Sequence, residues 1–224
     1  NDLVECYLDY DEDNSNIIPT EMPINILYED EALLIVNKPA GIPVHPSMDH
    51  YTDSLSNGIA FYFSKIGLKK KIRPVNRIDK DTSGIVIFAK NEYIQECLIR
   101  QMKLKQFVKK YIAVVNGNLD NLVGTINAPI ARKEGSIIER CVNENGNIAI
   151  THYKVLKMTA NYDIVECILE TGRTHQIRVH FAHIGHSLLG DTLYGTHSNL
   201  IKRQALHSYE VDFIHPITKQ NVKY

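Results

Sequence analysis

The feature that most constrains this fold is a run of short β-rich segments in the second half of the chain. Turn residues separate five of them, at 111–115, 124–130, 137–142, 149–156 and 162–169. Most of the links are too short for the crossover connections that parallel strands need, so neighbouring segments are expected to pair antiparallel. An alternating segment at 206–213 is expected to be the last strand.

The first half of the chain predicts a hairpin, a rigid loop, two helices and one buried strand. Apolar residues 26–28 and 33–36 flank an acidic turn, and a loop with three prolines follows at 38–46. A helix is expected over 54–66, and Asn91 is a good N-cap for another that runs to about 104. The wholly apolar, β-branched run at 84–89 predicts a central strand. A last helix is expected from Thr174 to Gly185, and the whole predicts an α+β fold with a mainly antiparallel sheet.

Composition indicates one large globular domain in 224 residues, of which 44% are hydrophobic. No apolar run approaches the roughly 20 residues of a membrane span, so no membrane association is expected. Cys97, Cys141 and Cys167 lie among apolar neighbours and form no Cys-x-x-Cys pair, which favours buried free thiols and a reducing, cytoplasmic location. Residues 1–23 are interpreted as an acidic leader and linker, and 24–224 as the main domain.

Charge is unevenly spread along the chain, although the formal net charge is only −1. Residues 1–31 contain ten acidic residues and no Lys or Arg, a local charge of −10. Residues 69–110 contain twelve Lys or Arg against four acidic residues, a local charge of +8. Such blocks usually only solvate a surface, but a basic block can also be the footprint of a polyanion.

Two segments carry the strongest candidates for chemistry. In the first, Asp79 and Asp81 precede the apolar strand and are flanked by Arg77 and Lys80. These carboxylates could serve only a local turn, but a functional carboxylate that must stay ionised is also stabilised by such cations. The second segment, 171–180, places a Gly turn and two arginines at a predicted helix start, where phosphates or a carboxylate could dock.

Other chemistries have weaker support. Seven of the ten histidines lie between His175 and His215, but the spacing lacks the usual metal-binding pattern and no cysteine is near. Neither the Gly-x-Ser-x-Gly elbow of serine hydrolases nor the Gly-Lys phosphate loop is present. A histidine-metal hydrolase therefore remains only a distant alternative.

Several ordered blocks together resemble the RluA-type pseudouridine synthases, which isomerise uridines in structured RNA. The resemblance runs from about residue 24 to 216. It rests on blocks at 26–31, 36–41, 77–84, 110–111, 129–130, 171–180 and 185–195.

This resemblance implies a mixed, mainly antiparallel central sheet flanked by helices and loops, with an RNA cleft across its middle. It implies that Asp79 is the catalytic carboxylate, that Arg178 pairs with it, and that Tyr111 stacks on the flipped target base. Arg77 would take the place of that base, and removal of Arg178 should impair catalysis more than folding. Further RNA contacts are expected from Asn76, Lys80, Lys38, Arg173, His175 and Gln176.

The resemblance also implies that no metal or organic cofactor is needed and that the partner is ribosomal or transfer RNA. A monomer is the default expectation. The alternative from another class is a non-catalytic RNA-binding module on the same scaffold. It would need only the cations, whereas Asp79, Tyr111 and Arg178 are all present here.

Two departures from the family pattern concern the first half of the chain. The family's Arg-Leu/Ile-Asp block usually follows a His, but Asn76 stands at that position and cannot carry a proton charge. Many relatives carry an upstream S4-type RNA-binding domain, and residues 1–23 are interpreted as its trailing end plus a linker.

Overall fold

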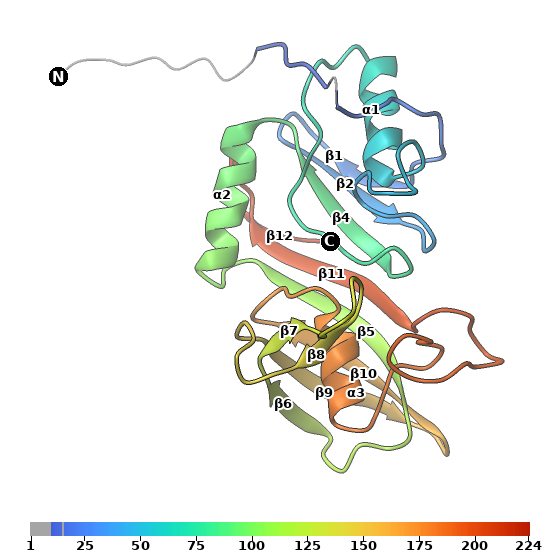
Figure 1. Cartoon of the computed structure of the whole chain (residues 1–224). Helices are drawn as coiled ribbons and strands as arrows, with labels where there is room; N and C mark the ends of the chain where they lie inside the picture. Colours follow the sequence, from blue (N-terminus) through green and yellow to red (C-terminus); the bar gives the residue numbers. More distant parts are fainter. Residues whose placement is uncertain (1–9, 15) are drawn as a thin grey trace.

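The computed structural model describes residues 10–14 and 16–224. One large sheet runs through the whole molecule and includes ten strands of the described part (Figure 1). Its main path, in spatial order, is β1 (Ile26–Glu29), β2 (Leu33–Lys38), β4 (Ser83–Ala89), β11 (Leu206–Ile214), β5 (Val108–Asn116), β10 (Tyr162–Leu169), β9 (Ile150–Met158) and β6 (Val123–Asn127).

Two short strands join this path from the side, and two more form a separate hairpin. β3 (Arg73–Pro74) pairs with β4, and β12 (Asn221–Lys223) pairs with β11. β7 (Ile130–Arg132) pairs with β8 (Arg140–Val142). Among the strand pairs of the described residues, β4 with β11 is the one parallel pair, so the expected mixed, mainly antiparallel sheet is confirmed.

Three helices in the described residues cover the two faces of this sheet. α1 (Leu55–Lys65) and α3 (Gln176–His183) contribute to one buried cluster, and α2 (Glu92–Lys103) to the other. β4 supplies both clusters alternately, because Val86 and Phe88 lie in the first and Ile85 and Ile87 in the second. This burial on both faces explains why the strand is apolar at every position.

Local signals in the sequence explain the elements of the first half. The Asp30 carboxylate accepts hydrogen bonds from the Ala32 and Leu33 amides and closes the predicted hairpin turn. Ser54 caps α1, and the Asn91 side chain accepts a hydrogen bond from the Ile94 amide at the start of α2. These are the side-chain acceptors that helix starts require.

Gly84 occupies the crossing point of the parallel pair, where β4 meets Ser208 of β11. Its φ of +117° disfavours other residues, and a Cβ there would lie 2.1 Å from the Ser208 carbonyl oxygen. A glycine is therefore required for the two halves of the sheet to join directly after the Asp79 loop.

The structure corrects several predicted boundaries. The predicted strand 124–130 divides into β6 and β7 around Pro129, which cannot donate to a ladder. The strand predicted at 137–142 is only β8, because Ile137 and Ile138 are exposed in the hairpin loop. The strand predicted at 206–213 is not the last, since β12 follows it. Cys167 is buried as predicted, whereas Cys97 and Cys141 are only half-buried; all three are free thiols.

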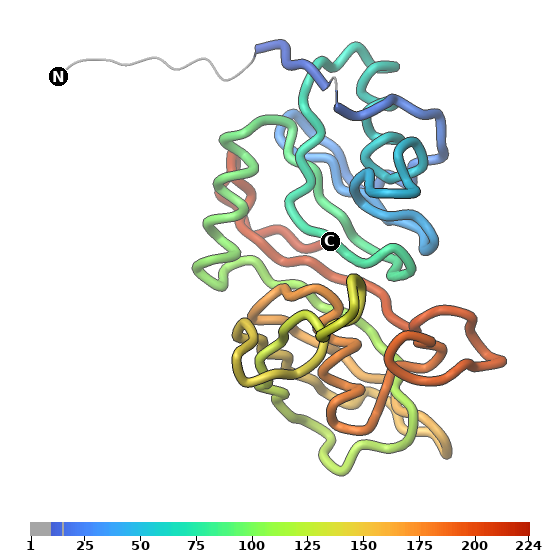
Figure 2. Tube along the Cα trace, viewed as in Figure 1, coloured from blue at the N-terminus to red at the C-terminus, as the bar shows by residue number. Residues whose placement is uncertain are grey.

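The acidic leader lies against the start of the basic block. Glu12 donates its amide to the Lys69 carbonyl oxygen, and its carboxylate binds the Arg73 guanidinium. Figure 2 shows this blue segment beside the chain that leads into β3. Predictions that concern residues 1–9 and 15 lie outside the described residues.

Candidate active site

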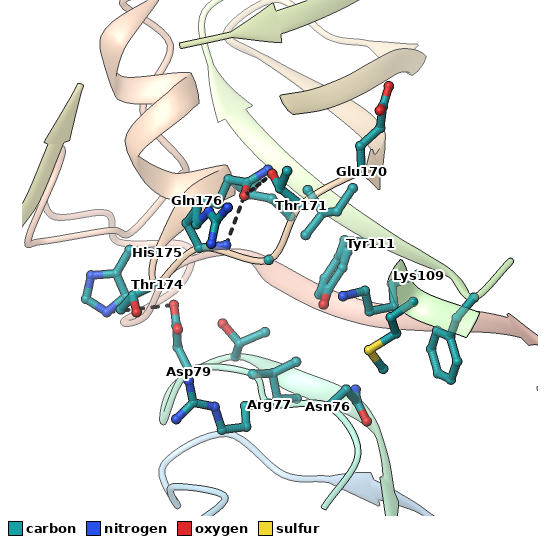
Figure 3. A pocket seen from close by; sticks show the side chains of 18 of the residues that line it. Asn76, Arg77, Asp79, Lys109, Tyr111, Glu170, Thr171, Thr174, His175 and Gln176 are labelled. Carbon is teal, nitrogen blue, oxygen red and sulfur yellow. Dashed lines mark hydrogen bonds and ion pairs between the residues drawn. The ribbon is translucent and has the colours of Figure 1, made fainter. Parts of the chain in front are cut away.

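A cavity of about 900 Å³ lies where the two halves of the sheet meet. Three segments supply most of its lining: the loop before β4, the start of β5, and the loop between β10 and α3. Figure 3 shows Arg77 and Asp79 on one side of this cavity, and His175 and Gln176 on the other. Tyr111 lies between Asp79 and Lys109. Both candidate segments of the sequence therefore meet at one site.

Asp79, Arg178 and Asp191 form a continuous chain of charges at this site. Arg178 donates from Nε and Nη2 to the two carboxylate oxygens of Asp191, at 2.7 and 2.9 Å. Its Nη1 donates to Asp79 Oδ2 at 3.2 Å. Because Asp191 holds the guanidinium on one side, the remaining nitrogen is aimed at Asp79.

Burial differs strongly along this chain of charges. The side chains of Arg178 and Asp191 are 8% and 1% exposed, whereas that of Asp79 is 24% exposed. Burial alone would lower the pKa of Arg178, but its bonds to Asp191 and the charges of both carboxylates raise it above the ordinary value. Arg178 is therefore a permanent cation, and Asp79 is the member that a ligand in the cavity can reach.

The loop that carries Asp79 is fixed by buried polar side chains. Lys38 is fully buried, and its ammonium donates to the carbonyl oxygens of Pro39, Ile42 and Lys80 at 2.7–2.8 Å. Burial lowers the pKa of Lys38 to about 8 despite the nearby charges of Asp81 and Asp79. The predicted RNA contact by Lys38 does not fit this burial, because all three of its donors are used within the protein.

Asn76 is buried in the same loop and bridges it to β4. Its amide donates to the Ile85 carbonyl oxygen at 3.0 Å, and its side-chain oxygen accepts from the Ile87 amide at 2.9 Å. A neutral amide suits this position because it both donates and accepts without carrying a charge. Asn76 is therefore assigned to positioning the Asp79 loop, in place of the expected RNA contact.

Gln176 has a similar task at the start of α3. Its side-chain oxygen accepts from the Arg173 amide and the Thr171 hydroxyl, and its nitrogen donates to the Ile150 carbonyl oxygen. It is buried, so it shapes the 171–175 loop and is not placed to contact RNA directly. The helix begins at Gln176, two residues later than predicted, since His175 has a left-handed φ of +59°.

Three of the four remaining predicted RNA contacts, Arg77, Arg173 and His175, line the cavity, whereas Lys80 does not. Arg77, Lys80 and Arg173 are exposed. His175 Nε2 lies 3.9 Å from Asp79 Oδ2, and its Nδ1 pairs with the Tyr194 hydroxyl at 2.7 Å. Burial is the main reason that the pKa of His175 is lowered, so the ring is predominantly neutral near pH 7.

Tyr111 is buried on β5 and faces the cavity between Asp79 and Lys109 (Figure 3). Burial, reinforced by the charge of Asp79, raises the pKa of its hydroxyl above the ordinary value of 10.0. The phenol therefore stays neutral and presents an aromatic ring to the cavity.

Sequence reasoning missed Asp191 and Tyr194 as parts of the site. The Arg178 guanidinium carbon lies 5.0 Å from the centre of the Tyr194 ring, so both residues orient Arg178. One signal for Asp191 was present: it is the sole acidic residue between Gly185 and Tyr209. A bidentate carboxylate such as Asp191 fixes the orientation of a buried guanidinium.

The histidines have separate partners in the structure. His180 contacts Thr151 and the Ala128 carbonyl oxygen, His186 the Asn116 carbonyl oxygen, and His215 the Asp30 carboxylate. Within residues 10–14 and 16–224, no three His, Cys, Asp or Glu side chains are grouped as a metal site. No helix in the same residues is long and apolar enough to cross a bilayer.

Known proteins are similar to this chain in sequence and in fold. Residues 32–183 match the family described as RNA pseudouridylate synthase. The Uncharacterized RNA pseudouridine synthase YhcT of Bacillus subtilis is 45% identical over 92% of this chain and 69% of the relative. Ribosomal large subunit pseudouridine synthase D of Zymomonas mobilis is 40% identical, again over 92% of this chain and 69% of the relative.

The solved structure of Human RNA Pseudouridylate Synthase Domain Containing 1 has the same fold. It superposes with a TM-score of 0.73 and 25% identity, covering 90% of this chain and 82% of that one. Fold and relatives together define an RNA-modifying isomerase. The chain belongs to the RNA pseudouridylate synthase family, as the resemblance of its motifs indicates.

Proposed function

We propose that this enzyme converts a uridine in ribosomal or transfer RNA to pseudouridine with Asp79 as its catalytic carboxylate. The observation that carries the proposal is the contact between Asp79 and Arg178 at the cavity, with Asp191 behind it. The reaction breaks the bond between C1′ and N1, turns the base, and joins C5 to C1′. Positive charge develops on the ribose as the first bond breaks, as in glycoside hydrolysis.

A single carboxylate beside the ribose can stabilise this charge, trap it covalently or remove a proton. Each of these tasks needs the Asp79 carboxylate beside the ribose, and the Arg178 cation lies 3.2 Å from it on the protein side. The site must also limit access of water while the base turns. Ile78 and Tyr111 are buried beside Asp79 and supply apolar walls for this purpose.

The target uridine must leave its stack before Asp79 can reach its ribose. Unstacking costs a few kcal/mol, and a base stacked on an aromatic side chain regains about 1–3 kcal/mol. We assign this stacking to Tyr111, whose neutral ring faces the cavity. We assign to Arg77, which is exposed and lines the cavity, the position that the base vacates.

Ribosomal RNA of the large subunit is the first target to test, because several relatives are named for it. The chain is 35–40% identical to ribosomal large subunit pseudouridine synthases D from four bacteria, Zymomonas, Xanthomonas, Xylella and Blochmanniella. Transfer RNA is the second target.

Tritium release tests the activity directly. Uridine labelled with tritium at C5 loses the label when that carbon bonds to C1′, so purified enzyme should release tritium from bulk ribosomal or transfer RNA. Pseudouridine mapping in cells that lack the protein should then show one or a few missing sites. No release from either RNA together with an unchanged pseudouridine map would contradict the proposal.

A further inference from the structure

The Lys109 ammonium faces the cavity and has no hydrogen-bond or ion-pair partner among the described residues. It lies two residues before Tyr111 on β5, so both side chains emerge on the same face of the strand. Figure 3 shows it on the side of Tyr111 that is away from Asp79. A Cβ built on Gly172 would lie 3.5 Å from its ammonium nitrogen, which places that nitrogen at the 171–175 loop.

The carboxylates of the cavity are engaged elsewhere. Glu170 binds Lys105 and His152, and Asp79 binds Arg178. The other charged groups of the lining on this side are the cations Lys103, Lys105 and Arg173. By contrast, the neighbouring Lys110 points to the opposite face and binds Glu210 at 2.8 Å.

Burial lowers the pKa of Lys109, and no charged group of residues 10–14 and 16–224 contributes to this shift. A half-buried ammonium without a counter-charge is unfavourable in the free protein. Its environment would improve if a ligand brought a negative charge into the cavity. The surrounding walls at Phe107 and Leu169 are apolar, which would strengthen such an interaction.

The cavity is also large for one nucleotide, because its volume of about 900 Å³ lies near the upper end of small-molecule sites. Tyr111 and Lys109 are two residues apart, about 7 Å along a strand. This separation is comparable to one nucleotide step in an unstacked strand. A base on Tyr111 would therefore leave the next phosphate of the RNA near Lys109.

We propose that Lys109 binds the phosphate of the nucleotide adjacent to the target uridine, and that this end of the cavity is the subsite for that nucleotide. The inference rests on the proposed function and deepens it, since the substrate becomes a strand with at least two unstacked nucleotides. A lysine provides a compact charge that suits a phosphate without requiring one orientation. Phosphate contacts of this kind fix the position of a nucleic acid without reading its sequence.

Lys109→Met tests this contact through the salt dependence of binding. The probe is a fluorescently labelled pentauridylate, with Lys157→Met on the exposed part of β9 as a control for net charge. Lys109→Met should weaken binding about tenfold and reduce the slope of log K against log salt by about 0.7, the loss of one single-strand phosphate contact. Lys157→Met should change neither quantity.

A variant that keeps the charge separates this role from a structural one. The ratio of wild-type affinity to Lys109→Arg affinity should fall between pH 7 and 10 as the free lysine loses its proton, because ionisation of the uracil rings in the probe affects both proteins alike. Lys109→Met should unfold at the same temperature as wild type or higher, because it removes an unpaired buried charge.

Equal affinity and salt slope in Lys109→Met and wild type would overturn the subsite. The subsite would also be overturned if the affinity of Lys109→Arg changed with pH in the same way as that of the wild type. These binding readouts are independent of tritium release by the wild-type enzyme. If Lys109→Met binds the probe more weakly but the wild type releases no tritium, the proposed function alone is contradicted. If the wild type releases tritium but Lys109→Met binds as the wild type does, the subsite alone is contradicted.

Discussion

Two parts of the basic block at 69–110 have opposite environments. The first, residues 69–73, is covered by the acidic leader, which binds it through Asp11 and Glu12. The second, residues 103–109, lines the active-site cavity, and there Lys109 has no bonding partner within the described chain. Similar charge densities therefore serve two purposes, one within the protein and one directed at a ligand.

This comparison limits what a charge count can reveal. The sequence predicts one footprint for a polyanion across 69–110, but several of its cations already bind carboxylates. Lys69, Arg73, Lys90, Lys105 and Lys110 are paired with acidic residues from other parts of the chain. The cations that line the cavity, Lys109 and Arg77 among them, are the ones that we propose to contact RNA.

Arg178→Ala should have the largest effect on stability, because Arg178 and Asp191 are more deeply buried than the Glu12–Arg73 pair of the leader. It leaves the buried Asp191 carboxylate without its counter-charge, although the Leu193 and Tyr194 amides still donate to it, and should cost about 3–5 kcal/mol in the free energy of unfolding. Urea unfolding measures this loss. Tritium release per folded molecule of the same variant tests the expectation from sequence that catalysis suffers more than folding.

A double variant provides the control for Arg178. Arg178→Met combined with Asp191→Leu removes both buried charges and should recover most of the stability without recovering tritium release. Recovery of activity along with stability would show that Arg178 has no role beyond folding.

Glu12→Ala should have a smaller effect and should leave catalysis intact. The Glu12 and Arg73 side chains are 6% and 10% exposed, so loss of the carboxylate leaves a nearly buried guanidinium without its partner. We expect a loss of about 1–3 kcal/mol in the free energy of unfolding. Tritium release per folded molecule should stay within twofold of wild type.

Asp11→Ala is the matched variant for Glu12→Ala. Its partner Lys69 is 71% exposed and Asp11 itself 75%, so this pair should contribute almost nothing to stability. Equal destabilisation of the two variants would contradict the different burial of the two ion pairs. Loss of turnover in Glu12→Ala would contradict the separation between residues 69–73 and the cavity.

The contribution of Glu12 should disappear in acid. Its hydrogen bonds with Arg73 are the main reason that its pKa is lowered from 4.5. A lowered folded-state pKa means that the stabilisation is complete above pH 4.5 and is lost as the pH falls through the folded-state value. The difference in unfolding free energy between wild type and Glu12→Gln should therefore be constant from pH 7 to 5 and shrink below pH 4. A difference that grows in acid would contradict this linkage.

The sequence predicts most of the fold where local signals act alone. The Asp30 turn, the Ser54 and Asn91 caps and the apolar run of β4 each produce the expected element. Prediction fails where distant contacts decide. β12 exists because it pairs with the end of β11, and α3 starts late because the His175 ring reaches Tyr194.

In the candidate site, too, the sequence predicts what local motifs determine and does not predict what distant contacts determine. Asp79, Arg178 and Tyr111 were identified from their motifs, and the structure places all three at one cavity. Burial could not be predicted from those motifs, so Lys38, Asn76 and Gln176 were expected to contact RNA although their polar atoms are used within the protein. Asp191 was missed because its importance depends on a neighbour that lies 13 residues away in the chain.

The most direct test of the account is tritium release by Asp79→Asn, measured beside wild type at equal concentrations of folded protein. Asparagine keeps the shape of the side chain but removes the charge that faces Arg178. The account predicts no release above background while RNA affinity stays within about tenfold, or 1.4 kcal/mol. Release by Asp79→Asn at the wild-type rate would contradict it.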